Sequence, residues 1–389
     1  MNIILFVHPV FLESQSMPKY AQMLSEGMRE RGHSVEIWSP ESFFFRLPVK
    51  QGWRKWFGYI DQYIIFPYQV KKRLKLIDNS TLFVFSDQAL GPWVPLVANQ
   101  AHVIHCHDFL SQKSALGEIP ENKSGWSGRQ YQAFIRRGFR TGKNFISVSE
   151  KTKSDLHRFL TAPFLRSSVV YNGLTTSFSQ VEPTEARRQL AKQINLDLTR
   201  GYILHVGGNQ WYKNRKGVVE IFEAWRKMEN TNLPLLMVGR KPGLALMNFC
   251  EKLTFRSDIH WLYDITDEQL SIAYSGATVF LFPSLAEGFG WPIAEAMAFS
   301  CPVITTNEAP MTEVAGEAGF FIDRRPFVET AANDWANDAA KVLNKVVGLG
   351  PEERKEAVMA GLKNIKRFDP DQKLNSIEAI YKEILQSGK

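Results

Sequence analysis

The sequence predicts an α/β protein with two doubly wound parallel-sheet domains. Short segments that are apolar along their whole length recur through the chain, as strands buried on both faces of a parallel sheet must be. Segments with helical spacing of apolar residues alternate with them, which is typical of doubly wound sheets. The length of 389 residues exceeds the size at which one hydrophobic core stops growing, so two domains are expected.

Six segments in each half of the chain are the expected strands. Those of the first half are residues 2–8, 34–40, 81–86, 102–108, 144–149 and 168–173. Those of the second half are residues 201–207, 233–239, 259–263, 278–284, 302–307 and 319–322. A typical intervening helix is expected at residues 18–32, in which Tyr20, Leu24 and Met28 share one face and Gly32 follows the last turn.

The polar segment at residues 177–201 is the best candidate for the join between the domains. We therefore predict an N-terminal domain at residues 1–180 and a C-terminal domain at residues 181–369. In such sheets ligands bind where strands end and helices begin. Binding and catalytic residues are accordingly expected in the turns after the strands.

The composition is that of an ordinary soluble protein, with 44% hydrophobic and 22% charged residues. No uncharged apolar stretch approaches the roughly 20 residues that span a bilayer. The first residues lack a basic leader, so a buried strand is expected there rather than a signal peptide. Cys106, Cys250 and Cys301 are scattered, odd in number and without metal-binding spacing, which predicts a reducing, cytoplasmic location.

The net charge of +7 is concentrated in the first half of the chain. Residues 1–180 contain 22 Lys and Arg against 13 Asp and Glu, whereas the remaining residues contain 25 against 27. Residues 46–75 contain eight basic residues, one acidic residue and seven aromatics. This composition suits peripheral membrane contact, with rings at headgroup level and cations near anionic lipids. The alternatives are an acceptor groove or plain packing, and no nucleic-acid-binding module accompanies the charge.

The most specific motif lies in residues 283–310, PSLAEGFGWPIAEAMAFSCPVITTNEAP. Two of its glutamates, Glu287 and Glu295, lie on either side of a glycine turn that follows an expected strand. Pro292 suits the first position of a helix, because its missing N–H would have no partner there. We therefore expect a helix from Pro292 onward, with Glu295 in its first turn.

The turn itself is suited to phosphate. Gly288 and Gly290 remove side chains where the backbone must turn tightly or approach a ligand closely. The exposed N–H groups around residues 289–293, other than that of Pro292, and the positive end of the helix dipole predict an anion site that needs no metal. The flanking carboxylates only accept hydrogen bonds, so they need hydroxyl partners, which a nucleotide sugar supplies on both sides of its diphosphate. The alternative for Glu295 is a simple capping or pairing role near the helix start.

Residues 287–319, EGFGWPIAEAMAFSCPVITTNEAPMTEVAGEAG, resemble the Glu-x7-Glu donor-site motif of the retaining, family 4 type nucleotide-sugar glycosyltransferases with the GT-B fold. Weaker pieces extend the resemblance over most of the chain, among them RERGHSVEIWSP, HCHDFL, SVSEKTKSDL, VVYNGL, HVGGNQWYKNRKG and RFDPDQKLNSIEAIYKEIL. The resemblance implies two Rossmann-like domains facing each other across a cleft, the first binding the acceptor and the second the donor. It also implies that the final helix, residues 370–389, crosses back onto the first domain.

The loop at residues 207–217, GGNQWYKNRKG, resembles the family segment that supplies an Arg and a Lys to the diphosphate. Lys213 matches the lysine, and Lys216 satisfies another common family spacing. The Arg position falls near Gly208, which leaves Arg215 or Asn209 as substitutes. Fixed cations here would stabilise the negative charge that the leaving diphosphate gains. The alternative is a solvated basic loop.

The resemblance also gives roles to the two glutamates: Glu295 matches the one that holds the ribose, and Glu287 the one that contacts hydroxyls of the donor sugar. With the loop, this predicts catalytic roles for Glu287 and Lys213. The predicted donor-binding residues are Glu295, Gly288, Phe289, Gly290, Trp291, Arg215, Lys216, Gly208 and Asn209.

In the first domain, His107 and Asp108 end the expected strand at residues 102–108. The resemblance places a His-Asp pair here, with the His near the donor sugar and the reaction centre, so His107 is the third predicted catalytic residue. His8 ends the first strand and belongs either to the core or to the acceptor pocket. The family's glycine pair in the first turn is replaced by residues 13–20. The predicted acceptor residues are His8, Ser16, Met17 and Asp108, with Ser14 as a further contact.

These features predict a metal-independent, retaining glycosyltransferase that moves a hexose-type sugar from a nucleotide-diphosphate donor to an acceptor hydroxyl, in polysaccharide, lipopolysaccharide or glycolipid biosynthesis. The expected partners are the donor, a sugar or lipid-linked glycan acceptor and, through residues 46–75, the inner face of a membrane; no cofactor, metal or nucleic acid is expected. The alternatives are a sugar-nucleotide epimerase or hydrolase, and an inactive carbohydrate- or nucleotide-binding subunit. A dinucleotide-dependent dehydrogenase is disfavoured, because neither domain has a Gly-x-Gly-x-x-Gly turn after its first strand.

Overall fold

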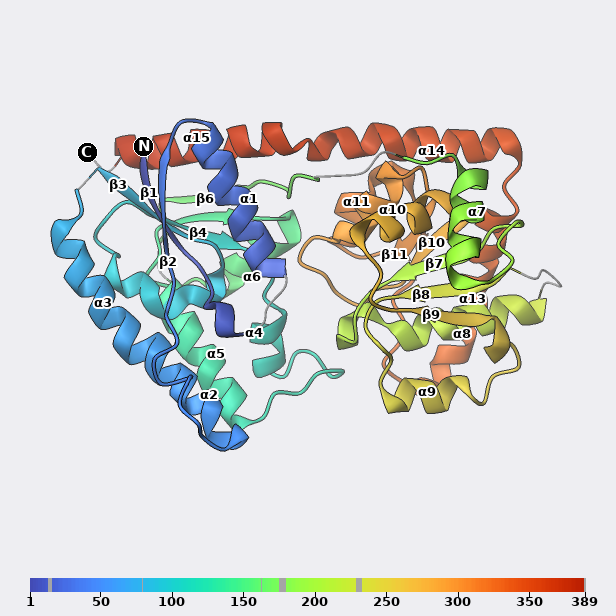
Figure 1. Ribbon diagram of the computed structural model, residues 1–389, viewed down its shortest axis with the longest axis horizontal. Coiled ribbons are helices and arrows are strands. Elements are labelled where there is room, and N and C mark those ends of the chain that lie inside the picture. The colour runs from blue at the N-terminus through green and yellow to red at the C-terminus, as the bar shows by residue number, and fades with distance from the viewer. Residues whose placement is uncertain (13–15, 79, 162, 175–179, 229–232, 388–389) are drawn as a thin grey trace. The chain divides into compact units, whose positions relative to one another are not determined.

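The computed structural model describes residues 1–12, 16–78, 80–161, 163–174, 180–228 and 233–387, and the chain divides into two compact units (Figure 1). The first unit comprises Met1–Ile119, Lys123–Gly173 and Pro370–Lys389, and the second comprises Pro120–Asn122 and Leu174–Asp369. Within the described residues, no helix combines the length and the apolar character that crossing a bilayer requires.

The described residues of the first unit contain a parallel sheet of six strands in the order β2-β1-β3-β4-β5-β6. The strands are β1 Asn2–Phe6, β2 Ser34–Trp38, β3 Thr81–Phe85, β4 His102–Cys106, β5 Asn144–Ser147 and β6 Arg166–Val169. All six expected strands of the first half are confirmed. The last begins two residues earlier than predicted, because Arg166 and Ser167 already pair with β5.

Helices cover both faces of this sheet, because alternate residues of each strand point to opposite sides. On one face Ile4, Phe85 and Ile104 are buried under α3, α5 and α6. On the other face Ile3 and Val84 are buried under α1 and α15, which lie side by side (Figure 1). The bounds are α1 Ser16–Glu30, α3 Phe66–Arg73, α4 Leu110–Ala115, α5 Trp126–Phe139, α6 Glu150–Phe159 and α15 Pro370–Ser387.

Residues 51–73 form a near-continuous helical rod (Figure 1). It consists of α2 Gln51–Ile60, a π-helical turn Asp61–Ile65 and α3. Its inner side is anchored to the rest of the unit: Trp93 Nε1 donates to Gln62 O at 2.9 Å, and the rings of Phe66 and Trp93 are 4.7 Å apart. The hydroxyls of Tyr63 and Tyr131 lie 2.7 Å apart, which ties the π-helical turn to α5.

The second unit repeats the plan, with six parallel strands among its described residues in the order β12-β11-β10-β7-β8-β9. The strands are β7 Ile203–Val206, β8 Leu235–Val238, β9 Ile259–Leu262, β10 Val279–Phe282, β11 Val303–Thr306 and β12 Gly319–Ile322, which confirms the six expected in this half. The helices are α7 Pro183–Ile194, α8 Arg215–Met228, α9 Leu244–Cys250, α10 Asp267–Gly276, α11 Trp291–Ala298, α12 Met311–Ala315, α13 Ala332–Val347 and α14 Pro351–Ile365. Both units are therefore doubly wound α/β folds, as predicted.

In each sheet the strand order reverses at one place, so that successive strands are added on opposite sides of that place. This switch point lies between β1 and β3 in the first sheet and between β7 and β10 in the second. Open parallel sheets bind ligands outside the carboxyl ends of their strands at such a point. The loops after β7 and β10 contain most of the residues predicted for donor binding.

Candidate functional site

The loops that follow β7 and β10 bring Lys213 and Glu287 together at the switch point of the second sheet. Lys213 Nζ lies 2.8 Å from Glu287 Oε1, and the two side chains are only 14% and 9% exposed. The backbone holds the loops together, because the N–H of Leu285 donates to Tyr212 O at 2.7 Å. This pair joins two residues predicted to be catalytic from separate motifs.

A buried serine fixes the position of Glu287. Ser284 Oγ lies 2.7 Å from Glu287 Oε1, and Thr306 Oγ1 donates to Ser284 O at 2.7 Å, which ties the β10 loop to β11. Among the described residues, Glu287 Oε2 has no hydrogen-bond partner. An ionised carboxylate oxygen is an acceptor, so Oε2 is the atom available to a sugar hydroxyl.

The glycine turn leads into α11 one residue earlier than predicted. The helix begins at Trp291, with Gly290 before it at φ +110°, a left-handed conformation that favours glycine. Pro292 is consequently the second helical residue, and Glu295 the fifth, in the second turn rather than the first. The ring of Phe289 packs against Phe368 at 5.4 Å and belongs to the core, so only its backbone is suited to ligand contact.

Glu295 is positioned by a tyrosine that the sequence did not single out. Tyr274 of α10 donates its hydroxyl proton to Glu295 Oε2 at 3.0 Å. Burial, and then the neighbouring Glu295 carboxylate, hold the pKa of Tyr274 well above its usual value. Tyr274 therefore stays a protonated donor, and Glu295 stays an acceptor directed by it.

The other predicted cations of the loop have different partners. Arg215 is buried at the start of α8, where Nη1 donates to Arg240 O at 2.9 Å and to Asn209 Oδ1, and the guanidinium lies 4.8 Å from the ring centre of Trp261. Lys216 Nζ lies 2.7 Å from Glu329. The structure thus places Lys213, rather than Arg215 or Lys216, beside Glu287, while Gly208 continues the turn after β7.

Asn214 links the two loops and was missed as a site residue. Its backbone is left-handed, with φ +49°, and its Oδ1 accepts from the N–H of Gly217 at 3.2 Å, which caps α8. Its Nδ2 donates to Pro283 O at 2.8 Å, across the switch point. An Asn before a helix start, with Gly three residues later, was the signal that could have found it.

The switch point of the first sheet carries its own polar pair. His8, after β1, lies with Nε2 2.8 Å from Asp87 Oδ2, after β3. Burial opposes ionisation of Asp87, but the hydrogen bond and charge of His8, the charge of His107 and the N–H of Ala89 together outweigh burial and lower the pKa of Asp87. His107 lies nearby after β4, with Nε2 2.8 Å from Ser86 O, and burial lowers the pKa of His107. Neutral His107 donates to that carbonyl through Nε2, which leaves Nδ1 as an acceptor.

The remaining residues predicted to contact the acceptor are less tightly grouped. Asp108 Oδ1 accepts from the N–H of Leu110 at 3.0 Å, so this side chain caps the start of α4. Met17 is half-buried in the first turn of α1. Ser14 and the side chain of Ser16 lie outside the described residues.

His105 and Cys106, which end β4 just before His107, point to opposite faces of the sheet. His105 lies 2.7 Å from both Tyr20 and Tyr381 hydroxyls, and burial lowers the pKa of His105 to about 3. Cys106 belongs to the core on the other face. His105 and Cys106 therefore do not converge on a common point, and the described residues contain no group of three or more His, Cys, Asp or Glu arranged to hold a metal.

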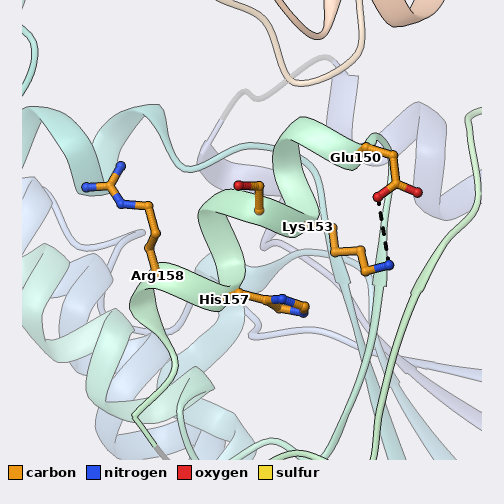
Figure 2. A pocket seen from close by; sticks show the side chains of 5 residues that line it. Glu150, Lys153, His157 and Arg158 are labelled. Carbon is orange, nitrogen blue, oxygen red and sulfur yellow. Dashed lines mark ion pairs between the residues drawn. The ribbon is translucent and has the colours of Figure 1, made fainter.

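An open pocket of about 530 Å³ lies along α6, and none of the predicted site residues lines it. Figure 2 shows Lys153 turned toward Glu150, with Nζ 3.7 Å from the carboxylate. Arg158 points to the other side of the helix, where it pairs with Glu118 at 2.9 Å. His157 lies 2.9 Å from Ser167 Oγ. The cations lining this pocket are thus paired within the unit.

Two family models match the chain, one over most of the first unit and one over most of the second. Residues 17–178 match Glycosyltransferase Family 4, and residues 186–361 match Glycosyl transferases group 1. The O-antigen chain mannosyltransferase B of Escherichia coli is 27% identical over 202 residues, 50% of this chain and 51% of that protein. The O-antigen chain mannosyltransferase RfbU of Salmonella typhimurium is 23% identical over 233 residues, 59% of this chain and 58% of that protein. The chain thus spans a little over half the length of these curated relatives.

Solved structures show the same fold over nearly the whole chain. Anabaena HepE, in complex with UDP and glucose, superposes with a TM-score of 0.70 at 14% identity, covering 98% of this chain and 99% of that one. WaaG, a glycosyltransferase involved in lipopolysaccharide biosynthesis, superposes with a TM-score of 0.66 at 16% identity, covering 98% and 99%. With two family matches, one on each unit, the chain has the GT-B fold and belongs to the family 4 type of glycosyltransferases.

Proposed function

We propose that this protein transfers a hexose from a nucleoside diphosphate sugar to an acceptor hydroxyl in the synthesis of a cell-surface polysaccharide or lipopolysaccharide. The observation that carries the proposal is the buried Lys213–Glu287 pair at the switch point of the second sheet. It places a fixed cation and a carboxylate acceptor side by side where such sheets bind ligands. Mannose is the sugar that the printed names of the relatives favour.

In this proposal different residues of the second unit bind different parts of the donor. Lys213 would hold the diphosphate and offset the charge that it gains as the glycosidic bond breaks. Glu287 would accept from a hydroxyl of the donor sugar through Oε2, while Ser284 keeps Oε1 in place. Glu295, directed by Tyr274, would accept from the ribose.

The reaction is proposed to retain the configuration of the sugar and to need no metal. The acceptor oxygen would attack from the face that the diphosphate leaves, and the departing phosphate oxygen would take the acceptor's proton. Lys213 and the backbone N–H groups at the start of α11 would supply the positive charge that a metal supplies in other transferases. His107, with Nδ1 as an acceptor, would hold a hydroxyl of the transferred sugar.

The acceptor is proposed to be a sugar or lipid-linked glycan bound by the first unit. His8 and Asp87 occupy the switch point of that sheet, and Asp87 directs one nitrogen of His8, leaving the other for a glycan hydroxyl. A lipid-linked acceptor would require work at a membrane surface, which residues 46–75 are proposed to contact. A second candidate, an inactive nucleotide-binding subunit, is favoured only by Gly208 at the position of the expected Arg.

The testing experiment measures thermal stabilisation by UDP, GDP and ADP, each with EDTA, in the wild type and in Glu295→Ala. Stabilisation by one nucleotide without metal, weakened in the variant, is expected. The corresponding sugar nucleotides are then incubated with the protein and a glycan acceptor. Release of nucleoside diphosphate only when acceptor is present supports transfer, whereas release without acceptor indicates a hydrolase, and nucleotide binding with no release indicates the inactive subunit.

A further inference from the structure

The outer side of the helical rod at residues 51–73 exposes a row of large apolar side chains. The exposed fractions are 62% for Trp53, 57% for Trp56, 62% for Ile64 and 60% for Tyr68, and we call these four residues the outer stripe. Gly58, Asp61, Gln62 and Phe66 face the opposite way and are buried. Scattered exposed apolar residues are ordinary, but a row along one rod marks an interaction surface.

The π-helical turn keeps the outer stripe on one side of the rod. Four residues advance an α-helix by about 40° more than a full turn. Over the distance from Trp56 to Tyr68 that drift would carry side chains around the helix. Asp61–Ile65 forms a wider π-helical turn, which cancels part of the drift and holds Ile64 and Tyr68 in line with Trp56.

Positive charge flanks the stripe, and residues 46–77 contain no exposed acid. Lys55, Lys71, Lys72 and Lys75 are exposed along the rod and just beyond its end, and we call them the basic flank. The one acid between residues 46 and 77 is Asp61, which is 1% exposed. Its two carboxylate oxygens accept from the backbone N–H groups of Phe44 and Phe45, at 2.9 Å each. Asp61 thus fixes the preceding loop, and all exposed charges of residues 46–77 are cationic.

We propose that the outer stripe and the basic flank dock this protein on an anionic lipid bilayer. Trp and Tyr rings suit the headgroup level, and Lys side chains reach anionic headgroups from the same face. A second copy of the chain fits poorly, because pairing two such surfaces would bring like charges together. The inner side of the rod is anchored by Trp93 and Tyr131, so the surface is formed before it meets the membrane.

The test is cosedimentation of the full chain with vesicles of phosphatidylcholine alone or mixed with phosphatidylglycerol, without any sugar nucleotide. We expect binding to the anionic vesicles only, weakened by salt. Lys71→Glu/Lys72→Glu should bind more than about 25-fold more weakly, since each lysine near an anionic surface contributes about fivefold. Trp53→Ser/Trp56→Ser should weaken binding by about tenfold or more, because two interfacial rings are lost.

Matched controls separate the surface from bulk charge and from unfolding. Lys363→Glu/Lys366→Glu makes the same charge change at exposed positions of the second unit, and Trp126→Ser removes an exposed Trp outside the stripe. Both controls should bind vesicles like the wild type, and all variants should keep the wild-type melting temperature. Equal binding to neutral vesicles, equal losses in the controls, or a wild-type dimer that only the stripe variants dissociate would each overturn the proposal. None of these outcomes depends on the transfer reaction, which is assayed separately.

Discussion

Removing the charge of Lys213 should destabilise the second unit far more than removing both charges of the Lys213–Glu287 pair. In Lys213→Met the Glu287 carboxylate, only 9% exposed, keeps Ser284 but loses its counter-ion. An uncompensated, largely buried charge costs about 3 kcal/mol, which lowers the melting temperature of a unit of this size by about 6–12 °C. Adding Glu287→Gln removes the stranded charge, so the double variant should recover most of that loss.

The assay is a double-mutant cycle followed by thermal unfolding of the wild type, the two single variants and the double variant. We expect a coupling free energy of about 1.5–3 kcal/mol, the range for hydrogen bonds between charged groups. The matched control is the cycle for Lys341 and Asp338, whose N–O distance is 2.7 Å but whose side chains are 66% and 73% exposed. That cycle should give at most about 0.5 kcal/mol. A coupling free energy for Lys213–Glu287 no larger than that of the control pair would refute the prediction that burial strengthens this ion pair.

Catalysis should respond differently from stability. Loss of the cation at the leaving diphosphate should lower turnover by about 10²–10³-fold in Lys213→Met. The double variant should stay as inactive as the single variants, although its stability recovers, because the chemistry needs both groups. Wild-type turnover in any of these variants would place the donor site elsewhere.

Three further perturbations test the surroundings of the site. Tyr274→Phe removes the donor to Glu295 and should weaken nucleoside diphosphate binding by about 5–10-fold in calorimetry, with unchanged affinity contradicting a role for this pair. Asn214→Ala loses the bond to Pro283 and strains a left-handed residue, so unfolding should require about 2 kcal/mol less, and Asn214→Gly should cost less because glycine tolerates that backbone. Because the pKa of Asp87 is lowered in the folded protein, its ionised carboxylate stabilises the fold at pH values above the pKa of the unfolded state. This stabilisation is lost as the pH falls through the pKa of the folded state. Asp87→Asn should therefore flatten the dependence of unfolding free energy on pH below about pH 4.

The strands were predictable because their signal is local. A run such as Leu235–Val238 is apolar throughout, and a strand buried on both faces needs nothing else to be recognised. The first residue of two predicted elements differs from the prediction. The β6 strand begins at Arg166, because polar residues at a sheet edge pair through the backbone without an apolar pattern. The α11 helix begins at Trp291, because the left-handed backbone of Gly290 starts the helix before the proline does.

The partners of the site residues were not predictable, because they come from distant parts of the chain. The sequence favoured Lys213 over Lys216 for the diphosphate, with Arg215 as a substitute for the missing Arg, but it did not give the partners of these three cations. The side chains have different partners because α8 begins at Arg215, which directs the Arg215 side chain toward β8 and β9. Lys213 stays in the preceding loop, where it faces Glu287. Tyr274 carried no motif of its own and matters only because α10 packs beside α11.

The sequence by itself determined the two α/β units, the glycine turn between two glutamates and the cationic, aromatic character of residues 46–75, because each is a property of a contiguous segment. Tertiary structure alone decided that Lys213 meets Glu287, that Tyr274 directs Glu295 and that Asp61 is hidden while Trp53 and Tyr68 are exposed. The physical reason is the order of the strands. It brings β7 beside β10, and with them two loops 74 residues apart, a pairing that backbone hydrogen bonds set and no local pattern encodes.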